Sequence, residues 1–428
     1  MNDVLAALIF VGAYVLIATE WVHRVVVALA GAGLMLLFRI VDASDAFSSE
    51  EYGIDWNVIF LLFGMMVIVG VLRYTGLFEY LAIWSAKKAR GRPYRVLALL
   101  IVITGAASAL LDNVTTVLLV APVTILICER LGVPPVPFLI AEALASNIGG
   151  MATLVGDPPN IIIASESDLS YTDFLLNLGP LALILLVVYI GMARWQFRGA
   201  LEFHPDRVSE VMSLDEREAL VRGPLLPRAI AVLAVVTVGF LFQEVTGYDP
   251  SVVALLGAGV LLLVARADPT VYLAEVEWHT LVFFMGLFIM VGALVKVGMI
   301  EALAERAIDL VDGHLFLAVV LLLVLSGVLS GLVDNIPYVA TMAPLVAQLA
   351  DSFPGEAVVL WWALAIGADL GGNATSIGAS ANVVVLGLSE RAGHPIRFVE
   401  WLRYGVPVTA VTLAVSLVYL WVRYFAFD

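Results

Sequence analysis

Four aspartates lie within otherwise apolar stretches of the sequence: Asp112, Asp157, Asp334 and Asp369. An ionisable side chain at bilayer depth costs roughly 2.5–3.5 kcal/mol on insertion scales, so such residues need a reason to be there. A carboxylate that is partly removed from water binds protons more tightly and responds to nearby cations. We therefore predict proton coupling or ion coordination at these four positions. The alternative is that each aspartate caps a broken helix by accepting backbone N–H bonds.

Amides and hydroxyls accompany these aspartates. The glycine pair Gly149-Gly150, followed by Gly156-Asp157-Pro158-Pro159, cannot remain a regular helix, because glycine is flexible and proline lacks an amide hydrogen. A break exposes backbone groups and points helix dipoles into the gap, where they can hold a polar solute. Besides the four aspartates, the predicted substrate- or ion-binding residues are Asn113, Thr115, Thr116, Asn147, Thr153, Asn160, Asn335, Asn373, Thr375, Ser376 and Asn382.

The same residues recur 222 positions later, which indicates an internal duplication. The matching pairs include Trp56 and Trp278, Asp112-Asn113 and Asp334-Asn335, Gly149-Gly150 and Gly371-Gly372, Thr153 and Thr375, and Asn160 and Asn382. No gap is needed between residues 56 and 160. The copies differ in charge at two positions, because Asn147 corresponds to Asp369 and Asp157 corresponds to Ala379.

The composition is that of a membrane protein. Of the 428 residues, 62% are hydrophobic and 14% are charged, whereas globular domains carry roughly 45–50% apolar and about 25% charged residues. The net charge of −15 argues against nucleic acid as a partner, because phosphate binding needs clustered lysine and arginine. The single cysteine, Cys128, excludes an intramolecular disulfide, and the five histidines are scattered. We therefore expect no metal site and no cofactor.

The apolar windows predict an all-α polytopic membrane protein with about ten crossings. Two pairs of windows, 95–111 with 114–128 and 314–333 with 336–350, are separated only by Asp-Asn and are each interpreted as a re-entrant hairpin. Each copy then has five crossings, one hairpin and one broken helix, and the odd number of crossings inverts the second copy. The predicted parts are the first repeat 1–197 (scaffold helices 4–90, hairpin and broken helix 95–164, closing helix 174–195), the linker 198–226, and the second repeat 227–428 with its hairpin and broken helix within 314–390.

Loop charges predict the orientation. Five basic residues cluster between positions 87 and 95, and the positive-inside rule places that loop in the cytoplasm. Alternation from there puts Arg24 and the linker 198–226 on the cytoplasmic side and both termini on the outer face. We expect the chain to lie in the cell inner (plasma) membrane.

The strings that carry a family resemblance are Leu111-Asp112-Asn113-Val114-Thr115-Thr116, Ser146-Asn147-Ile148-Gly149-Gly150, Gly156-Asp157-Pro158-Pro159-Asn160, Asp334-Asn335-Ile336-Pro337 and Gly371-Gly372-Asn373. They resemble the ion transporter superfamily, particularly the branch of arsenite-efflux permeases, NhaD-type sodium/proton antiporters and the melanosomal P-protein. The resemblance implies alternating access by a transport domain on a scaffold, usually as a homodimer. Dicarboxylate carriers of the wider superfamily have Ser-Asn-Thr at the hairpin tips, whereas this chain has Asp-Asn, which argues against a dicarboxylate.

The sequence predicts a secondary transporter rather than an enzyme. It contains no G-x-x-x-x-G-K-[ST] phosphate loop, so transport by this chain alone must use a gradient. The first hypothesis is export of arsenite or antimonite as the neutral hydroxide in exchange for protons. The alternative is sodium (cation)/proton antiport, with another small ion, a channel or an aspartyl protease as lesser alternatives. The expected partners are a small inorganic substrate with protons or Na⁺, membrane lipid, a second copy of the chain, and, left open, an ATPase subunit.

Overall fold

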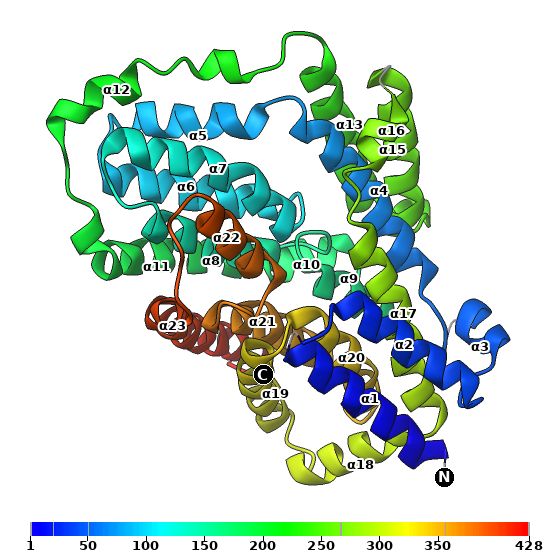
Figure 1. Cartoon of the computed structure of the whole chain (residues 1–428). Coiled ribbons are helices and arrows are strands. Elements are labelled where there is room, and N and C mark those ends of the chain that lie inside the picture. The colour runs from blue at the N-terminus through cyan, green and yellow to red at the C-terminus, as the bar shows by residue number, and fades with distance from the viewer. Residues whose placement is uncertain (1, 20, 50, 266–267, 356, 427–428) are drawn as a thin grey trace.

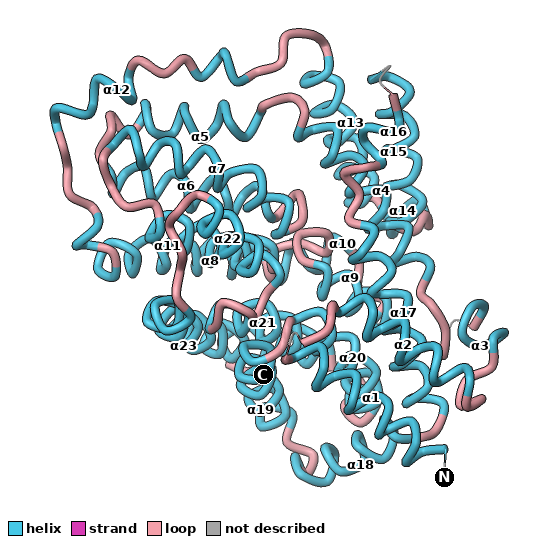
Figure 2. The backbone as a smooth tube through the Cα atoms, in the orientation of Figure 1, coloured by secondary structure: helices cyan, strands magenta, loops and turns pink. Residues whose placement is uncertain are grey.

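The computed structural model describes residues 2–19, 21–49, 51–265, 268–355 and 357–426. Helices joined by loops make up these residues, and no strand occurs in that part of the chain (Figure 2). The helices of the first half are α1 (Asn2–Ala18), α2 (Arg24–Leu37), α3 (Ala43–Ser48), α4 (Trp56–Arg73), α5 (Leu77–Lys88), α6 (Pro93–Ser108), α7 (Asn113–Leu131), α8 (Val136–Gly150), α9 (Pro158–Ser167), α10 (Tyr171–Asn177) and α11 (Gly179–Gln196).

The second half repeats this order after a connecting segment. Its helices are α13 (Leu225–Leu241), α14 (Gln243–Thr246), α15 (Pro250–Ala265), α16 (Pro269–Leu273), α17 (Trp278–Lys296), α18 (Met299–Val311), α19 (Leu315–Leu332), α20 (Asn335–Asp351), α21 (Val358–Gly371), α22 (Ser380–Arg391) and α23 (Phe398–Tyr424). The connecting segment holds α12 (Val208–Met212) and short 3₁₀ turns. The predicted all-α membrane fold is confirmed.

The two copies run in opposite directions. Helix α4 leads into α5 at the top of Figure 1, whereas its counterpart α17 leads into α18 at the bottom. The turn between the two helices is the same in both copies, because Gly76 and Gly298 both adopt a left-handed conformation, with φ of 72° and 75°. A residue with a side chain is strained there, so glycine is required at both turns.

Helices of one copy pack closely against helices of the other. Helix α15 lies against α4, and α2 lies against α17. An added Cβ on Gly64 would lie 2.7 Å from the backbone of Ala254, and one on Gly286 would lie 2.8 Å from the backbone of Ala28. Small residues allow this approach and are a common means of helix association in membranes. The two copies therefore interlock.

The predicted hairpins and broken helices correspond to pairs of helices in the structure. Helices α6 and α7 form the first hairpin, α19 and α20 the second, and the breaks separate α8 from α9 and α21 from α22. The second arm of each broken helix packs against the other copy's hairpin, α9 against α20 and α22 against α7. The predicted closing helix 174–195 is wrong in one respect: it divides at Leu178 into α10 and α11, where Pro180 starts a new helix.

Six helices in the described residues are long and apolar enough to cross a membrane individually: α4, α7, α11, α17, α19 and α23. The prediction of about ten crossings therefore requires shorter apolar helices such as α1, α2, α13 and α15 to cross as well. The boundaries 1–197, 198–226 and 227–428 stay a prediction, with α11 ending at Gln196 and α13 beginning at Leu225. Residues 1, 427 and 428 of the two termini lie outside the described residues.

The connecting segment is attached to the first copy. Lys87 of α5 donates a hydrogen bond to Glu216 and another to the carbonyl of Leu214. The ammonium group lowers the pKa of the Glu216 carboxyl below its usual value. The backbone N–H of Val221 donates to the carbonyl of Thr75. These contacts hold the segment across α5, as Figure 1 shows.

Helix α8 depends on a glycine for its position. An added Cβ on Gly149 would lie 2.1 Å from the carbonyl oxygen of Gly105 in α6. We expect Gly149→Ala to lower the free energy of unfolding by about 1–3 kcal/mol, as overpacking usually does. Thermal unfolding of the purified protein in detergent measures this. Gly12→Ala is the matched control, because nothing lies within 4 Å of a Cβ there, and equal melting temperatures for both variants would contradict the packing argument.

Candidate functional site

The two hairpin tips are built as helix caps. Asp112 precedes α7 and its Oδ1 accepts a hydrogen bond of 2.7 Å from the N–H of Thr115. Asp334 precedes α20 and its Oδ1 accepts one of 3.1 Å from the N–H of Ile336. Both aspartates therefore have the structural role that the sequence left as an alternative, and each keeps its second carboxylate oxygen free of the cap.

Asp157 brings the two tips together. Its Oδ2 accepts a hydrogen bond of 2.6 Å from the amide of Asn113, and its two oxygens lie 3.3 and 3.4 Å from the amide nitrogen of Asn335. All three side chains are buried. Asp157 lies at the start of α9 yet does not cap it, so its carboxylate is free to bridge the first and second hairpins.

Asn147 of α8 extends this network to the second broken helix. Its Oδ1 accepts from Asn113 at 3.1 Å, and its amide nitrogen donates to Asn373 at 2.9 Å and to Asn382 at 3.2 Å. These side chains are also buried. Residues more than two hundred positions apart in the sequence thus belong to one hydrogen-bonded network of amide and carboxylate groups at the centre of the protein.

Two asparagines and two threonines hold the helix breaks open. The amide of Asn160 donates to the carbonyls of Gly150 and Thr153, and the amide of Asn382 donates to those of Gly372 and Thr375. The hydroxyl groups act in the same symmetric way, with Thr153 donating to Ala109 and Thr375 to Gly331, both at 2.6 Å. The asparagines satisfy backbone carbonyls at the breaks, and the threonines satisfy carbonyls at the ends of α6 and α19, which is a structural role.

Asp369 differs from the other three aspartates. It lies within α21, is fully buried, and neither of its oxygens has a hydrogen-bond partner in the described residues. Two other side-chain oxygens of the predicted site, Asn113 Oδ1 and Asn160 Oδ1, are also buried without a partner in the described residues. An orphaned buried carboxylate is expensive, so a proton, a cation or a hydroxyl donor is expected there.

The remaining predicted residues lie around this centre. The backbone of Thr115 and the hydroxyl of Thr116 contribute to the cap at Asp112, with Thr116 donating to the Asp112 carbonyl at 2.9 Å. Ser376 is buried in the segment between α21 and α22. Their positions next to the tip and the break are as predicted, and their predicted binding role stays a prediction.

The sequence did not predict the partners of Arg24. Arg24 is the first residue of α2 and its Nη1 lies 3.0 Å from Asp334 Oδ2 and 2.9 Å from Ser380 Oγ. Its position on the cytoplasmic side stays a prediction. The positive-inside rule counts an arginine near a helix end as solvated and takes no account of tertiary partners. The signal in the sequence that could have indicated such a contact is a lone arginine at the start of an apolar stretch.

Comparison with known proteins identifies the family to which this chain belongs. Residues 14–367 match the family described as citrate transporter (CitMHS). The chain belongs to that family. It is 54% identical to an uncharacterized transporter of Mycobacterium tuberculosis, over 99% of both chains, and 34% identical to the human P protein over 98% of this chain. The chain spans 60% of the P protein's length. The predicted resemblance to the ion transporter superfamily is confirmed.

Solved structures of membrane transporters share the fold. The YdaH transporter of Alcanivorax borkumensis aligns with a TM-score of 0.61 at 16% identity, covering 94% of this chain and 98% of its own. MtrF of Neisseria gonorrhoeae, which belongs to a class of antimetabolite efflux pumps, aligns with a TM-score of 0.64 at 11% identity, covering 92% and 85%. The solved structures share the fold, and the family match makes the chain a membrane transporter.

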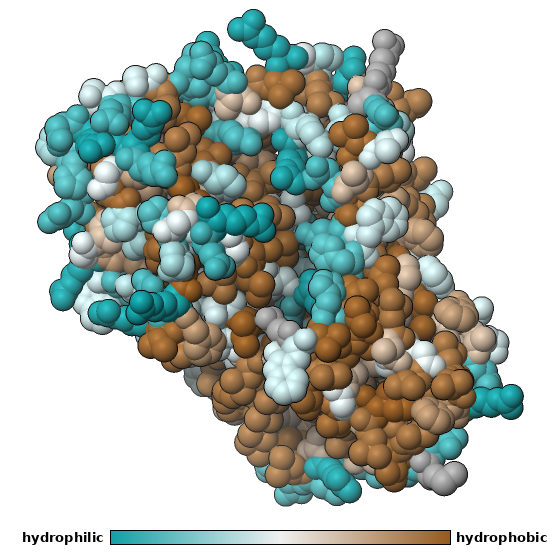
Figure 3. All heavy atoms as spheres, viewed as in Figure 1, coloured by the Kyte–Doolittle hydropathy of each residue, from teal (hydrophilic) through white to brown (hydrophobic). Residues whose placement is uncertain are grey.

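A vestibule leads from the surface of this transporter toward the buried network. It has a volume of about 470 Å³ and is lined by residues of the α1–α2 turn, α7, α17 and α22 together with Asp334. A smaller chamber of about 20 Å³ adjoins it and is lined by Asp112, Asn113, Asp157 and Asn335, among others. Figure 3 shows a hollow with hydrophilic residues along it between the two halves of this face.

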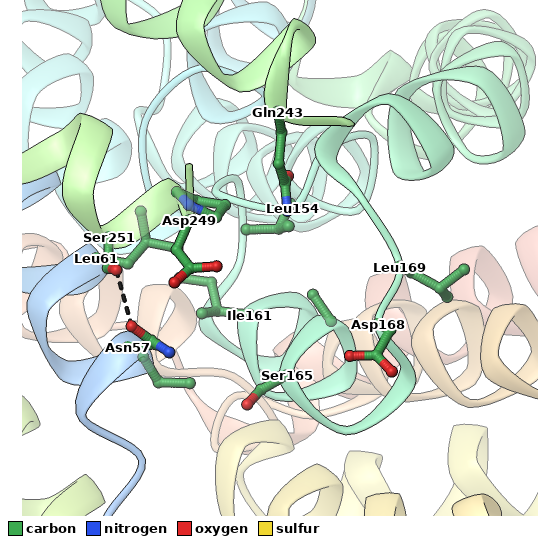
Figure 4. Close-up of a pocket in the computed structure, with 13 residues that line it drawn as sticks. Asn57, Leu61, Leu154, Ile161, Ser165, Asp168, Leu169, Gln243, Asp249 and Ser251 are labelled. Atoms are coloured by element: carbon green, nitrogen blue, oxygen red, sulfur yellow. Dashed lines mark hydrogen bonds between the residues drawn. The ribbon is translucent and has the colours of Figure 1, made fainter. Parts of the chain in front are cut away.

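A second cavity of about 190 Å³ is related to the vestibule by the repeat. Asn57 and Ile161 line it, and their counterparts 222 positions later, His279 and Val383, line the vestibule. Figure 4 shows Asn57 bonded to Ser251, with Asp249 close to them and Asp168 on the opposite side of the cavity. None of the predicted site residues lines this cavity. In this conformation the cavity therefore does not reach the predicted site, whereas the vestibule reaches Asp334.

Proposed function

We propose that the protein is a proton-coupled secondary transporter that exports arsenite or antimonite as the neutral hydroxide. One observation supports this most strongly. The unpartnered buried polar atoms of Asn113, Asn160 and Asp369 in the described part of the site are all oxygens, whereas each of the six site asparagines donates at least one hydrogen bond through its amide nitrogen. A cargo that fits must supply hydrogens or positive charge.

The first broken helix reinforces this acceptor character. The N-terminus of a helix usually offers backbone N–H groups to anions. In α9, however, the first two residues are Pro158 and Pro159, which have no N–H to offer. With Asp157 beside them, this end of the site disfavours an anion such as a carboxylate. A neutral trihydroxide brings three O–H donors and avoids the charge repulsion.

Coupling to protons is assigned to Asp157 and Asp369. Both carboxylates are buried, and they come from different copies of the repeat. Asp157 accepts hydrogen bonds from two amides, which favour the charged form of a carboxylate. Asp369 has no donor and is the position where a proton is held while cargo is absent. Exchange of that proton for cargo gives antiport by alternating access.

Sodium/proton exchange is the second candidate, and the size of the inner chamber favours it. A volume of about 20 Å³ holds little more than one water-sized particle. Carboxylate and amide oxygens are suitable ligands for a dehydrated cation of that size. The trihydroxide needs a wider chamber than this conformation provides.

The deciding experiment measures flux of As(III) and of ²²Na⁺ side by side in proteoliposomes under an imposed pH gradient, without nucleotide. We expect As(III) to be exchanged for protons and ²²Na⁺ flux to stay at the level of empty liposomes. Proton-driven ²²Na⁺ flux without As(III) flux would replace the first candidate with the second. Absence of both fluxes in protein that remains folded would overturn both candidates.

Cys128→Ala is the control variant for thiol chemistry. Cys128 is the single cysteine of the chain and is buried in α7. As(III) transport should be unchanged in this variant, and its loss would show that a thiolate takes part. The cytoplasmic position of the linker, the homodimer and an ATPase partner stay predictions.

A further inference from the structure

Arg24 joins three separate elements at the second hairpin tip. Its Nη1 donates to Asp334 Oδ2 at 3.0 Å and to Ser380 Oγ at 2.9 Å. The hydroxyl of Ser380 in turn donates to Asp334 Oδ2 at 2.8 Å. Arg24 begins α2, Asp334 precedes α20, and Ser380 begins α22. The three side chains form a closed triangle, which we name the Arg24 triad.

The triad stands between the vestibule and the inner chamber. Four residues line both cavities: Arg24, Val114, Glu277 and Ser380. This layer of side chains therefore lies between the vestibule and the chamber that Asp157 lines. The guanidinium is held in place from the side by Phe283, whose ring centroid is 5.4 Å from Arg24 Cζ.

The first copy of the repeat has no equivalent triad. The glycines Gly31 and Gly33 of α2 align with Gly257 and Gly259 of α15 at a spacing of 226, which places Pro250 opposite Arg24. At the spacing of 222, Pro158 stands opposite Ser380. Neither proline side chain can hydrogen-bond. The triad therefore occurs at one of the two hairpin tips and is not part of the packing that both copies share.

The ion pair between Arg24 and Asp334 is partly exposed, as expected for a contact that opens and closes. The Arg24 and Asp334 side chains are 25% and 17% exposed. Solvent screens a partly exposed ion pair, so separating it costs far less than separating a buried one. The hydroxyl of Ser380 fixes the orientation of the Asp334 carboxylate toward Arg24. The ion pair between Arg24 and Asp334 is still weak enough to break within a transport cycle.

We propose that the Arg24 triad is the gate between the vestibule and the buried site. When the triad is closed, α2 is tied to the second hairpin and to α22, and the chamber is sealed. When Arg24 leaves Asp334, the layer that both cavities share opens and solute reaches Asp157. This proposal rests on the transporter assignment but not on which cargo is carried.

Thiol labelling tests the gate without any cargo. In the Cys128→Ala background, Met66→Cys places a reporter in the chamber and Val22→Cys places one in the vestibule, in front of the gate. The probe is methyl methanethiosulfonate, which is neutral and so is not attracted or repelled when Arg24 is changed. We expect Arg24→Gln to raise the labelling rate of Met66→Cys about tenfold, the effect of losing one charge-assisted hydrogen bond. The rate at Val22→Cys should not change.

Two further variants separate gating from loss of structure. Asp334→Asn should raise labelling of Met66→Cys to the same extent as Arg24→Gln, and the double variant should give no further increase, because both changes break one contact. Arg24→Lys, which keeps the charge, should stay near the parent rate. An unchanged rate at Met66→Cys in Arg24→Gln, or an equal rise at both reporters, would overturn the gate. Since labelling needs no flux, failure here is distinct from failure of the proposed cargo.

Discussion

Asp369→Asn should reduce proton-coupled transport by at least about a hundredfold, corresponding to ~2.7 kcal/mol, while the protein still folds. The carboxylate of Asp369 is buried and has no partner in the described residues, so it is the group best placed to hold and release a proton. Its counterpart in the first copy is Asn147, so an amide occupies the equivalent position there. The substitution removes the ionisable group and leaves its shape.

Flux in proteoliposomes under a pH gradient, together with the melting temperature of the same preparation, measures this effect. Asp351→Asn is the matched control, because it makes the same chemical change at the exposed end of α20. That control should transport at the parent rate. Parent-level flux in Asp369→Asn would remove this residue from the coupling mechanism.

The second large effect is expected at Asp157. Asp157→Ala deletes the acceptor shared by Asn113 and Asn335, which join the two hairpin tips. An orphaned buried donor costs about 1–3 kcal/mol, so this variant should lose both transport and thermal stability. Asp157→Asn retains an acceptor oxygen and should keep most of the stability while losing transport, because the ionisable group is gone.

Melting curves and flux distinguish the two substitutions. The informative comparison is between Asp157→Ala and Asp157→Asn in the same detergent, with the parent protein as reference. Equal melting temperatures for both variants would show that the carboxylate does not hold the tips together. Transport by Asp157→Asn at the parent rate would show that its charge is not needed for coupling.

The sequence predicted the hairpins and breaks because their signals are local. Asp112-Asn113 and Asp334-Asn335 interrupt apolar stretches, and Pro158-Pro159 cannot continue the preceding helix and stands at the start of α9. The duplication at a spacing of 222 then predicted the inverted arrangement of α4 and α17, since an odd number of crossings leaves no other orientation. The division of the predicted closing helix at Leu178 was missed because both segments are apolar.

The roles within the site could not be assigned in the same way. Asp112, Asp157, Asp334 and Asp369 look alike in the sequence, yet two cap helices, one bridges the tips and one has no partner. These differences depend on which distant side chain each carboxylate meets. Asn147 meets Asn373 and Asn382 only because α8 packs against the 3₁₀ turn Gly372–Ala374 and against α22.

The sequence by itself determined that this chain is a duplicated, all-helical membrane transporter with polar breaks at defined positions, because apolar length, proline and glycine act on the chain within a few residues. The tertiary structure alone decided that Arg24 meets Asp334 and Ser380 and that Asp369 has no partner among the described residues. The physical reason is that a charged group in a membrane protein takes its role from the partners that packing brings within hydrogen-bond distance, and those partners lie hundreds of residues away.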